Sequence, residues 1–219
     1  MTADLFETHE AGARETLAPG ACVLRGFALG HEAAVLAALD TVLAAAPPRR
    51  MIVPGGHRMS VAMTNSGALG WVTDASGYRY VGHDPASDRA WPALPDAFAE
   101  LAASAAREAG FEGFAPDACL VNVYEPGARL SLHRDADEPD RSQPIVSVSL
   151  GLPATFLFGG LRRSDPAQPV RLGHGDVVVW GGPSRLRYHG VRALAAGVHP
   201  RLGARRVNLT FRKAAPPTV

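Results

Sequence analysis

The chain has 219 residues, of which 47% are hydrophobic, and a net charge of +1 at pH 7. This length corresponds to a single domain with a substantial core, and the composition excludes a disordered chain. The near-zero net charge excludes a global positive field that attracts nucleic acid, so any such contact must come from a local patch. Two distant cysteines, Cys22 and Cys119, without a Cys-x-x-Cys spacing, are typical of free buried thiols in a reducing compartment.

The N-terminal residues 1–7 lack the basic start and apolar run of a secretory signal. No apolar run in the sequence approaches the roughly 20 residues that cross a bilayer. We therefore expect a cytoplasmic protein without membrane contact, which acts as a monomer and needs no obligate protein partner.

The first half of the chain predicts two helices among short strands and loops. His31–Ala46 is rich in Ala and Leu and stops at two prolines, and Asp96–Ala109 is amphipathic. We expect a partly ordered lead-in over residues 1–20, then short strands and a loop: strands at Ala21–Arg25 and Met59–Met63, and a loop at Asn65–Gly70. Tyr78 and Tyr80 alternate as in a strand, so both rings should share one face.

The second half of the chain has the pattern of an all-β core. From Ala118 onward, short β-branched runs alternate with Gly and Pro turns. These runs are Cys119–Tyr124, Leu130–Asp135, Ile145–Leu150, Thr155–Phe158, Val170–Leu172, Asp176–Trp180, Arg187–Val191 and Arg206–Arg212. Because the predicted helices precede the predicted strands along the chain, we expect an α+β fold. Its core is a double-stranded β-helix, or jelly roll, of about eight strands, with the N-terminal helices on one face.

His133 and Asp135 stand two residues apart in one of these runs. Side chains at i and i+2 of an extended strand leave on the same face, which places an imidazole beside a carboxylate. With His189 as third ligand, they form the two-His, one-carboxylate set that binds Fe(II) and leaves positions open. A His-x-Asp pair also occurs by chance on surfaces, and His174, in a tight Gly-His-Gly turn, is a rival third ligand.

A polar face runs along Arg206–Arg212. Arg206, Asn208, Thr210 and Arg212 fall on one side of the strand and the apolar residues fall on the other. Such a strand is often an edge strand with a solvated face. Two guanidinium groups on one face also suit a dicarboxylate, which they bind bidentately, and a second polar pair, Asn122 and Tyr124, extends the same lining.

Taken together, these motifs resemble the AlkB family of Fe(II)/2-oxoglutarate-dependent nucleic-acid dealkylases. The resemblance covers about residues 20–213. The segments that match the family pattern are Met51–Asn65, Leu69–Trp71, Pro116–Tyr124, Leu130–Asp135, Ile145–Pro153, Phe158–Gly160, His174–Gly182, Tyr188–Gly190 and Asn208–Arg212. It implies one dioxygenase domain over 1–219, with a nucleotide-recognition lid at about 45–92 and the jelly-roll core at 116–213.

The resemblance also implies a role for each matching residue. His133, Asp135 and His189 ligate iron and are the catalytic centre. The 2-oxoglutarate site comprises Asn122, Val123, Tyr124, Arg206, Val207, Asn208, Leu209, Thr210, Phe211 and Arg212. The substrate site comprises Trp71, Tyr78, Arg79, Tyr80, Asp137 and Arg163, with Trp71 and His133 enclosing the damaged base.

The implied reaction uses Fe(II), 2-oxoglutarate and O2. It oxidatively demethylates N-alkylated bases such as 1-methyladenine and 3-methylcytosine in single- and double-stranded DNA, with release of formaldehyde, succinate and CO2. RNA or tRNA is an alternative substrate, as is another substrate class for the same oxygenase. A non-catalytic metal-binding jelly roll is a further alternative, but metal binding alone does not require two aligned arginines that face the metal. The chain departs from the family pattern at Val53, His57, Arg58 and Arg134, near the lid and the backbone groove, which bears on strand preference and substrate range.

Overall fold

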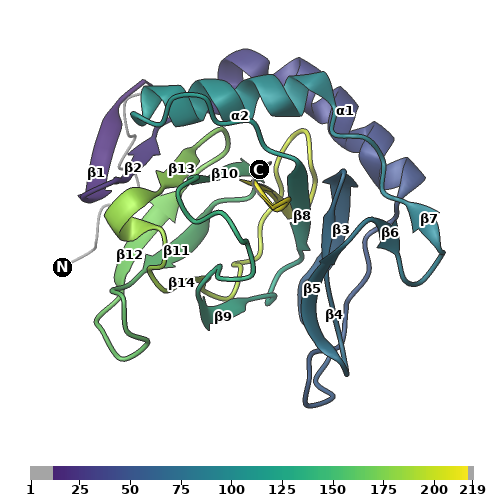
Figure 1. The fold of residues 1–219 in the computed structure, drawn as a ribbon. Helices are drawn as coiled ribbons and strands as arrows, with labels where there is room; N and C mark the ends of the chain where they lie inside the picture. Colours follow the sequence, from purple (N-terminus) through teal and green to yellow (C-terminus); the bar gives the residue numbers. More distant parts are fainter. Residues whose placement is uncertain (1–11, 217–219) are drawn as a thin grey trace.

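The structure, a computed structural model, describes residues 12–216 and is organised around two β-sheets (Figure 1). The helices are η1 (Phe27–His31), α1 (Glu32–Ala45), α2 (Asp96–Glu108) and η2 (Gly182–Ser184). The strands of the first half are β1 (Arg14–Ala18), β2 (Ala21–Leu24), β3 (Ala62–Gly67), β4 (Gly70–Asp74), β5 (Gly77–Val81), β6 (His83–Asp84) and β7 (Arg89–Ala90). Those of the second half are β8 (Ala118–Tyr124), β9 (Leu130–His133), β10 (Ile145–Gly151), β11 (Ala154–Phe158), β12 (Gln168–Leu172), β13 (Val177–Trp180), β14 (His189–Val191) and β15 (Arg206–Arg212).

The eight strands β8 to β15 form the predicted jelly roll. Within the described residues, the larger sheet has the order β1-β2-β13-β10-β15-β8-β3, and the smaller sheet has the order β12-β11-β14-β9. Four of the eight strands therefore lie in each sheet, as in a double-sheet jelly roll. The predicted fold class is confirmed, and β15 is a central strand between β10 and β8 rather than an edge strand.

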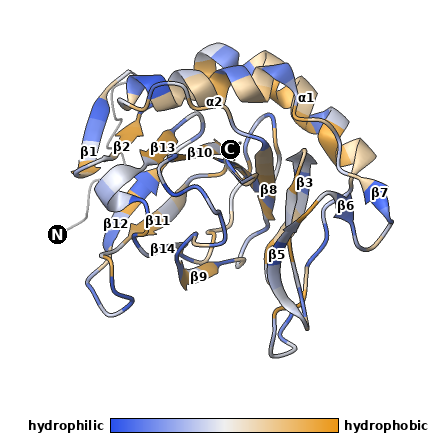
Figure 2. Cartoon of the chain, in the orientation of Figure 1, coloured by the Kyte–Doolittle hydropathy of each residue, from blue (hydrophilic) through white to orange (hydrophobic). Residues whose placement is uncertain are grey.

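Helices α1 and α2 run side by side over one face of the larger sheet (Figure 1). Helix α2 buries Phe98, Leu101 and Ala105 at helical spacing, and α1 buries Leu39 and Val42. These side chains join the inward apolar residues of the sheet in one hydrophobic cluster, and Figure 2 shows hydrophobic residues along α1, β8 and β13. The helices therefore cover one face, and the opposite face of the sheet is left for the site.

One helical stretch departs from the expectation about apolar runs. Phe27–Ala45 spans 19 residues with a mean hydropathy of 1.4, which is long and apolar enough to cross a membrane by length and composition. The sequence prediction of no such run is therefore wrong. In this fold the buried residues of α1 belong to the cluster beneath the helices, and 28% of the apolar window is buried.

The N-terminal half differs from prediction in two places. Part of the expected lead-in, Arg14–Ala18, is strand β1, paired with β2; residues 1–11 lie outside the described part. The strand expected at 59–63 lies later, at β3, so the loop expected at Asn65–Gly70 was wrong. Thr64, Asn65 and Ser66 are buried polar residues whose backbone pairs with β8. Pairing in the sheet outweighs their weak strand propensity, and part of the expected lid therefore belongs to the core sheet.

Candidate metal centre and its cavity

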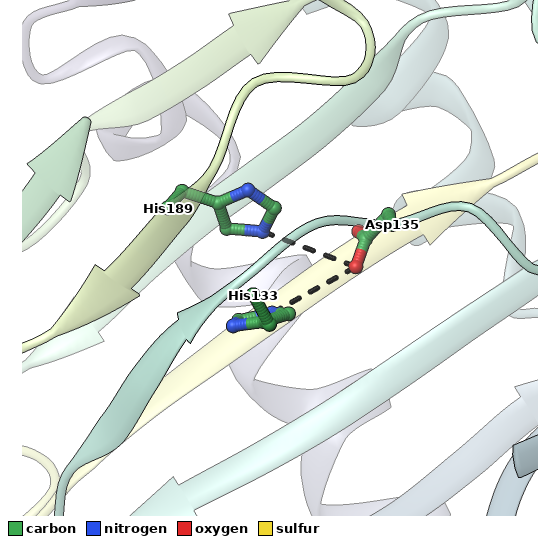
Figure 3. A group of neighbouring side chains, drawn as sticks. All are labelled: His133, Asp135 and His189. Carbon is green, nitrogen blue, oxygen red and sulfur yellow. Dashed lines mark ion pairs between the residues drawn. The ribbon is translucent and has the colours of Figure 1, made fainter. Parts of the chain in front are cut away.

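Strand pairing in the smaller sheet brings the two candidate histidine ligands together. β14 pairs antiparallel with β9, and His189 lies directly opposite His133. Strand β9 ends at His133, so Asp135 follows the strand rather than continuing it, a correction to the expected run Leu130–Asp135. The Asp135 Oδ1 atom lies 3.7 Å from Nε2 of His133 and 3.9 Å from Nε2 of His189 (Figure 3). One ligand atom from each of the three lies within 4.8 Å of the others.

The tautomers of both histidines are fixed by backbone carbonyls. The Nδ1 atom of His133 lies 2.9 Å from the Ser131 carbonyl, and Nδ1 of His189 lies 3.1 Å from the Arg187 carbonyl. A carbonyl oxygen only accepts, so Nδ1 carries the proton in each ring and Nε2 is left with a lone pair. Burial and the neighbouring His133 lower the pKa of His189 to about 3, so its imidazole is neutral, the form that binds a metal.

Asp135 is buried and ionised. Burial opposes its charge, but the Arg212 guanidinium and the two imidazoles hold the pKa of its carboxyl well below the ordinary value. Nε and Nη2 of Arg212 donate to Oδ2 of Asp135 at 2.8 and 2.6 Å. Oδ2 is thus occupied by the arginine, and Oδ1 faces the two histidines. Two imidazoles and one carboxylate fit Fe(II), which favours this donor set and keeps open positions for other ligands.

The triad opens into a cavity of about 830 Å³. Arg206, Asn208, Thr210 and Arg212, the polar face of β15, line it. Because β15 is central, this face points into the molecule rather than to solvent, and all seven residues of the strand are buried. Its alternate residues Val207, Leu209 and Phe211, like Val123 on β8, pack in the core under the helices and do not line the cavity.

Arg206 offers the clearest place for a carboxylate. It is 1% exposed, its Nη2 donates to Ser149 at 2.9 Å, and its Nε and Nη1 have no hydrogen-bond partner among the described residues. Burial lowers the pKa of Arg206. Because a buried charge is costly unless it is paired, a ligand carboxylate is the natural partner. Asn122 and Tyr124 complete this end of the cavity. The buried Oδ1 of Asn122 also has no partner in the described part of the chain, and the Tyr124 ring lies 5.0 Å from the Arg206 guanidinium carbon.

The mouth of the cavity is formed partly by the β4–β5 hairpin. Trp71 and Tyr78 line it, and their rings stack with centroids 5.6 Å apart. The Trp71 indole N–H donates to Oδ2 of the exposed Asp137 at 2.9 Å. An aromatic face and a carboxylate thus lie together at the mouth of the metal cavity, which suits a flat, positively charged group.

The other predicted substrate residues divide into two groups. Arg163 lines the cavity and makes no ion pair among the described residues. Arg79 does not line it; both of its terminal nitrogens donate to Asp74 within the same hairpin, at 3.0 and 2.6 Å. Tyr80 shares the face of Tyr78, but its hydroxyl donates to Glu138 at 2.6 Å and its side chain does not line the cavity.

Two residues beside the triad carry no motif in the sequence. Glu138, 2% exposed, and Arg185, 3% exposed, form a buried ion pair at 3.0 Å. Nη1 of Arg185 also donates to the backbone carbonyl of Asp135 at 2.8 Å. An acidic residue after Asp137 resembles a solvated charge run, so only the fold shows that Glu138 is buried.

His174, the rival third ligand, lies outside the triad. Its Nδ1 accepts a hydrogen bond from the Gly151 N–H at 2.9 Å, and its Nε2 lies 3.2 Å from a Glu32 carboxylate oxygen. It does not line the cavity. The structure therefore favours His189 over His174 as the third ligand.

Comparisons with known proteins define the class to which this fold and site belong. The model of the 2OG-Fe(II) oxygenase superfamily matches residues 20–212. The alpha-ketoglutarate-dependent dioxygenase AlkB of Salmonella typhimurium strain LT2 is 59% identical over 212 residues, which cover 97% of this chain and 98% of that protein. The solved structure of OsALKBH1 superposes with a TM-score of 0.80 at 27% identity and covers 92% of this chain and 100% of that one. A shorter match is to the DNA N(6)-methyladenine demethylase ALKBH1D of Arabidopsis thaliana, 44% identical over 108 residues, or 44% of this chain and 24% of that protein.

A jelly roll with this triad and this superfamily match is an oxygenase that uses Fe(II), 2-oxoglutarate and O2. His133, Asp135 and His189 would hold the iron, which would supply the activation of O2, and bound 2-oxoglutarate would supply the reducing electrons. Within that superfamily the chain belongs to the AlkB family of alpha-ketoglutarate-dependent dioxygenases.

Proposed function

We propose that this dioxygenase demethylates N-alkylated bases, 1-methyladenine and 3-methylcytosine, in single- and double-stranded DNA. The products are the repaired base, formaldehyde, succinate and CO2. A nucleic-acid substrate is supported by the family and by a relative in Arabidopsis thaliana that is a DNA N(6)-methyladenine demethylase. The choice of DNA and of these two lesions rests on the chemistry of the cavity mouth.

The observation that carries the proposal is the pairing of Trp71 with Asp137 above the triad. A base methylated at N1 of adenine or N3 of cytosine is cationic and cannot pair normally, so flipping it out of the stack costs little. The indole face attracts the cation through its quadrupole, and the exposed Asp137 carboxylate attracts it by Coulomb interaction. A neutral, paired base gains neither attraction and costs more to extrude.

Phosphate contacts come from four arginines around the cavity. Arg58, Arg129, Arg134 and Arg163 line it, are exposed, and make no ion pair within residues 12–216. The Arg134 guanidinium lies over the Tyr188 ring at 5.7 Å. Unpaired guanidinium groups around one opening form a local positive patch on a chain whose net charge is only +1. Arg58 and Arg134 stand where the family pattern differs, so they are the residues through which this chain sets its strand preference.

RNA, including tRNA, is the second candidate substrate, because the same phosphate patch and the same aromatic face serve either nucleic acid. A contact to the 2′-hydroxyl separates the two. We further propose that the enzyme works as a cytoplasmic monomer; its two cysteines are free and buried, as is usual in a reducing compartment.

The test is formaldehyde and succinate release with Fe(II), 2-oxoglutarate, O2 and a single-stranded oligonucleotide carrying 1-methyladenine. The unmethylated oligonucleotide, the matching RNA and an Asp135→Ala variant run in parallel. We expect turnover that requires both the methyl group and Asp135, and that is faster on DNA than on RNA.

Each other result changes the proposal in a definite way. If turnover is faster on RNA than on DNA, the proposed activity becomes RNA demethylation. Equal, slow consumption of 2-oxoglutarate with methylated and unmethylated strands leaves the oxygenase but removes the nucleic-acid substrate. If metal-loaded protein consumes no 2-oxoglutarate, the proposal of a catalytic site is withdrawn.

A further inference from the structure

The buried carboxylate of Glu138 joins three donors that come from separate parts of the fold. Its Oε1 accepts the Tyr80 hydroxyl at 2.6 Å and lies 3.3 Å from Nε of Arg212. Its Oε2 accepts Nη2 of Arg185 at 3.0 Å. The three donors come from β5, from the C-terminal strand β15 and from the segment that follows η2. Glu138 itself is not a metal ligand in this geometry, since the triad consists of other residues.

Both arginines held by Glu138 also hold Asp135. Arg212 donates twice to the Asp135 side chain, at 2.8 and 2.6 Å, and Arg185 donates to its backbone carbonyl at 2.8 Å. Asp135 lies beyond the end of β9, so no strand pairing fixes its position. Its carboxylate is therefore oriented by Arg212 and its main chain by Arg185, and both arginines share Glu138.

The β4–β5 hairpin reaches the same segment at two points. Trp71 and Tyr80 are directly opposite in the hairpin, so they point to one face. Trp71 donates to Asp137 and Tyr80 donates to Glu138. Burial raises the pKa of the Tyr80 hydroxyl well above its ordinary value, so it remains a donor.

We propose that Glu138 is a positioning residue for the metal centre: through Arg212 and Arg185 it fixes the Asp135 carboxylate with Oδ1 toward the metal, and the Tyr80 hydroxyl ties this arrangement to the hairpin. This gives Tyr80 a role in supporting the metal ligand, beside its predicted place in the substrate site.

Charge gives Glu138 a second effect on the metal. The two carboxylates of Asp135 and Glu138 balance the two guanidinium groups of Arg185 and Arg212. Without the Glu138 charge, Arg212 would interact with Asp135 alone and would draw the ligand carboxylate toward itself. The site would also gain one uncompensated positive charge next to a divalent cation, which weakens metal binding.

The test uses Co(II) in place of Fe(II), because Co(II) binds the same donors and its visible absorption reports coordination geometry. The affinity and the spectrum are measured in the full chain, without nucleic acid, for Glu138→Gln and Tyr80→Phe. We expect Glu138→Gln to lower Co(II) affinity by about 10- to 100-fold, and Tyr80→Phe by about tenfold, as for other residues that orient metal ligands. We expect both to change the Co(II) spectrum, which a loss of folding stability alone does not do.

Matched controls are Tyr78→Phe, which removes a hydroxyl from the same face of the hairpin, and Glu125→Gln, which neutralises an exposed carboxylate paired with Arg50. Both should keep the wild-type Co(II) affinity and spectrum. If Glu138→Gln does not fold, Tyr80→Phe, which keeps the ring, decides the question. Wild-type affinity and spectrum in the folded variants would overturn the proposal, and because no nucleic acid is present this outcome is independent of the substrate.

Discussion

The two ends of the cavity are built in opposite ways. At the metal end most of the polar groups are buried, on or beside strands of both sheets, and most are already bonded: Asp135 to Arg212, and each histidine Nδ1 to a carbonyl. At the mouth, the four arginines of the rim are exposed and make no ion pair within the described chain. The difference shows where each part of the function resides: the metal end is organised before any ligand arrives, and the mouth offers unsatisfied charge to a ligand from solvent.

Arg206 is the exception to the bonding pattern at the metal end of the cavity. It lies at the buried end, yet two of its nitrogens have no partner within residues 12–216. The buried end is therefore complete for the metal but incomplete for the co-substrate. The two arginines of β15 should respond in opposite ways when they are removed.

The largest effect is expected from Arg212→Met. The substitution leaves two buried carboxylates, Asp135 and Glu138, without their shared cation. Breaking such a buried pair costs about 3–5 kcal/mol of unfolding free energy, and we expect metal binding and turnover to be lost with it. Urea unfolding of the metal-free protein measures the first effect and Co(II) titration the second. Wild-type stability in this variant would show that the pairing at the metal end is not needed for the fold.

Arg206→Met should separate co-substrate binding from stability. It removes a buried cation that has no acidic partner within residues 12–216, so the unfolding free energy should stay the same or rise. Loss of a buried guanidinium–carboxylate contact costs about 2–5 kcal/mol, so the KM for 2-oxoglutarate should rise about 100-fold. Co(II) affinity without 2-oxoglutarate should remain that of the wild type. Destabilisation as severe as in Arg212→Met would contradict the assignment of an unpaired Arg206.

Gly190→Ala tests the close approach of the two strands that carry the histidines. A Cβ at Gly190 would lie 2.8 Å from the Leu130 carbonyl oxygen of β9, closer than real contacts allow. We expect β14 to move away from β9 and displace His189 from His133, with a fall in turnover of up to about 100-fold for a shift of about 1 Å. Gly30→Ala is the control, because a Cβ there meets nothing within 4 Å. Equal turnover of the two variants would show that the strand spacing does not set the metal geometry.

At the mouth, single changes should be milder and should depend on salt. Arg163→Ala and Arg134→Ala should each weaken oligonucleotide binding several-fold and reduce the magnitude of the salt slope by about 0.7 for a single strand. Co(II) affinity should not change. Arg162→Ala is the matched control: its neighbour is Arg163, but it pairs with Asp165 and does not line the cavity. A salt slope that falls equally in the control would assign the effect to net charge rather than to the rim.

The sequence was sufficient for the parts of the site that strand period and register create. The polar face of Arg206–Arg212 depends on local geometry that any strand imposes. The His133–Asp135 pair was found from its spacing, but Asp135 lies beyond the end of β9, so strand period alone does not place it. The strand boundaries nearest the polar stretches were less predictable. Thr64–Ser66 has the composition of a loop, but pairing with β8 makes it a buried strand.

Side-chain partners that come from distant elements could not be predicted. Nothing local marks Glu138 as buried, Arg79 as bonded within its own hairpin, or the Tyr80 hydroxyl as bonded to Glu138. In the sequence, an arginine at the cavity mouth looks the same whether or not it forms an ion pair. The division between a bonded metal end and an unpaired rim is therefore a property of the fold.

Tyr80 connects the two regions, and its hydroxyl predicts a small effect at high pH. Burial raises its pKa well above the ordinary value of about 10, so the unfolded chain releases this proton first as pH rises. Its contribution to stability is full below pH 10 and is lost as pH rises further, at up to about 1.4 kcal/mol per pH unit.

Tyr80→Phe removes this one contribution, whereas Tyr124, whose pKa burial also raises, keeps its own. We therefore expect the unfolding free energy of the variant to fall less steeply between pH 10 and 11 than that of the wild type, as measured by urea denaturation of the metal-free protein. Tyr78→Phe, at an exposed position on the same face, should keep the wild-type slope. Identical slopes for all three proteins would mean that the Tyr80 hydroxyl is open to solvent, and that the hairpin is not fixed to the metal end.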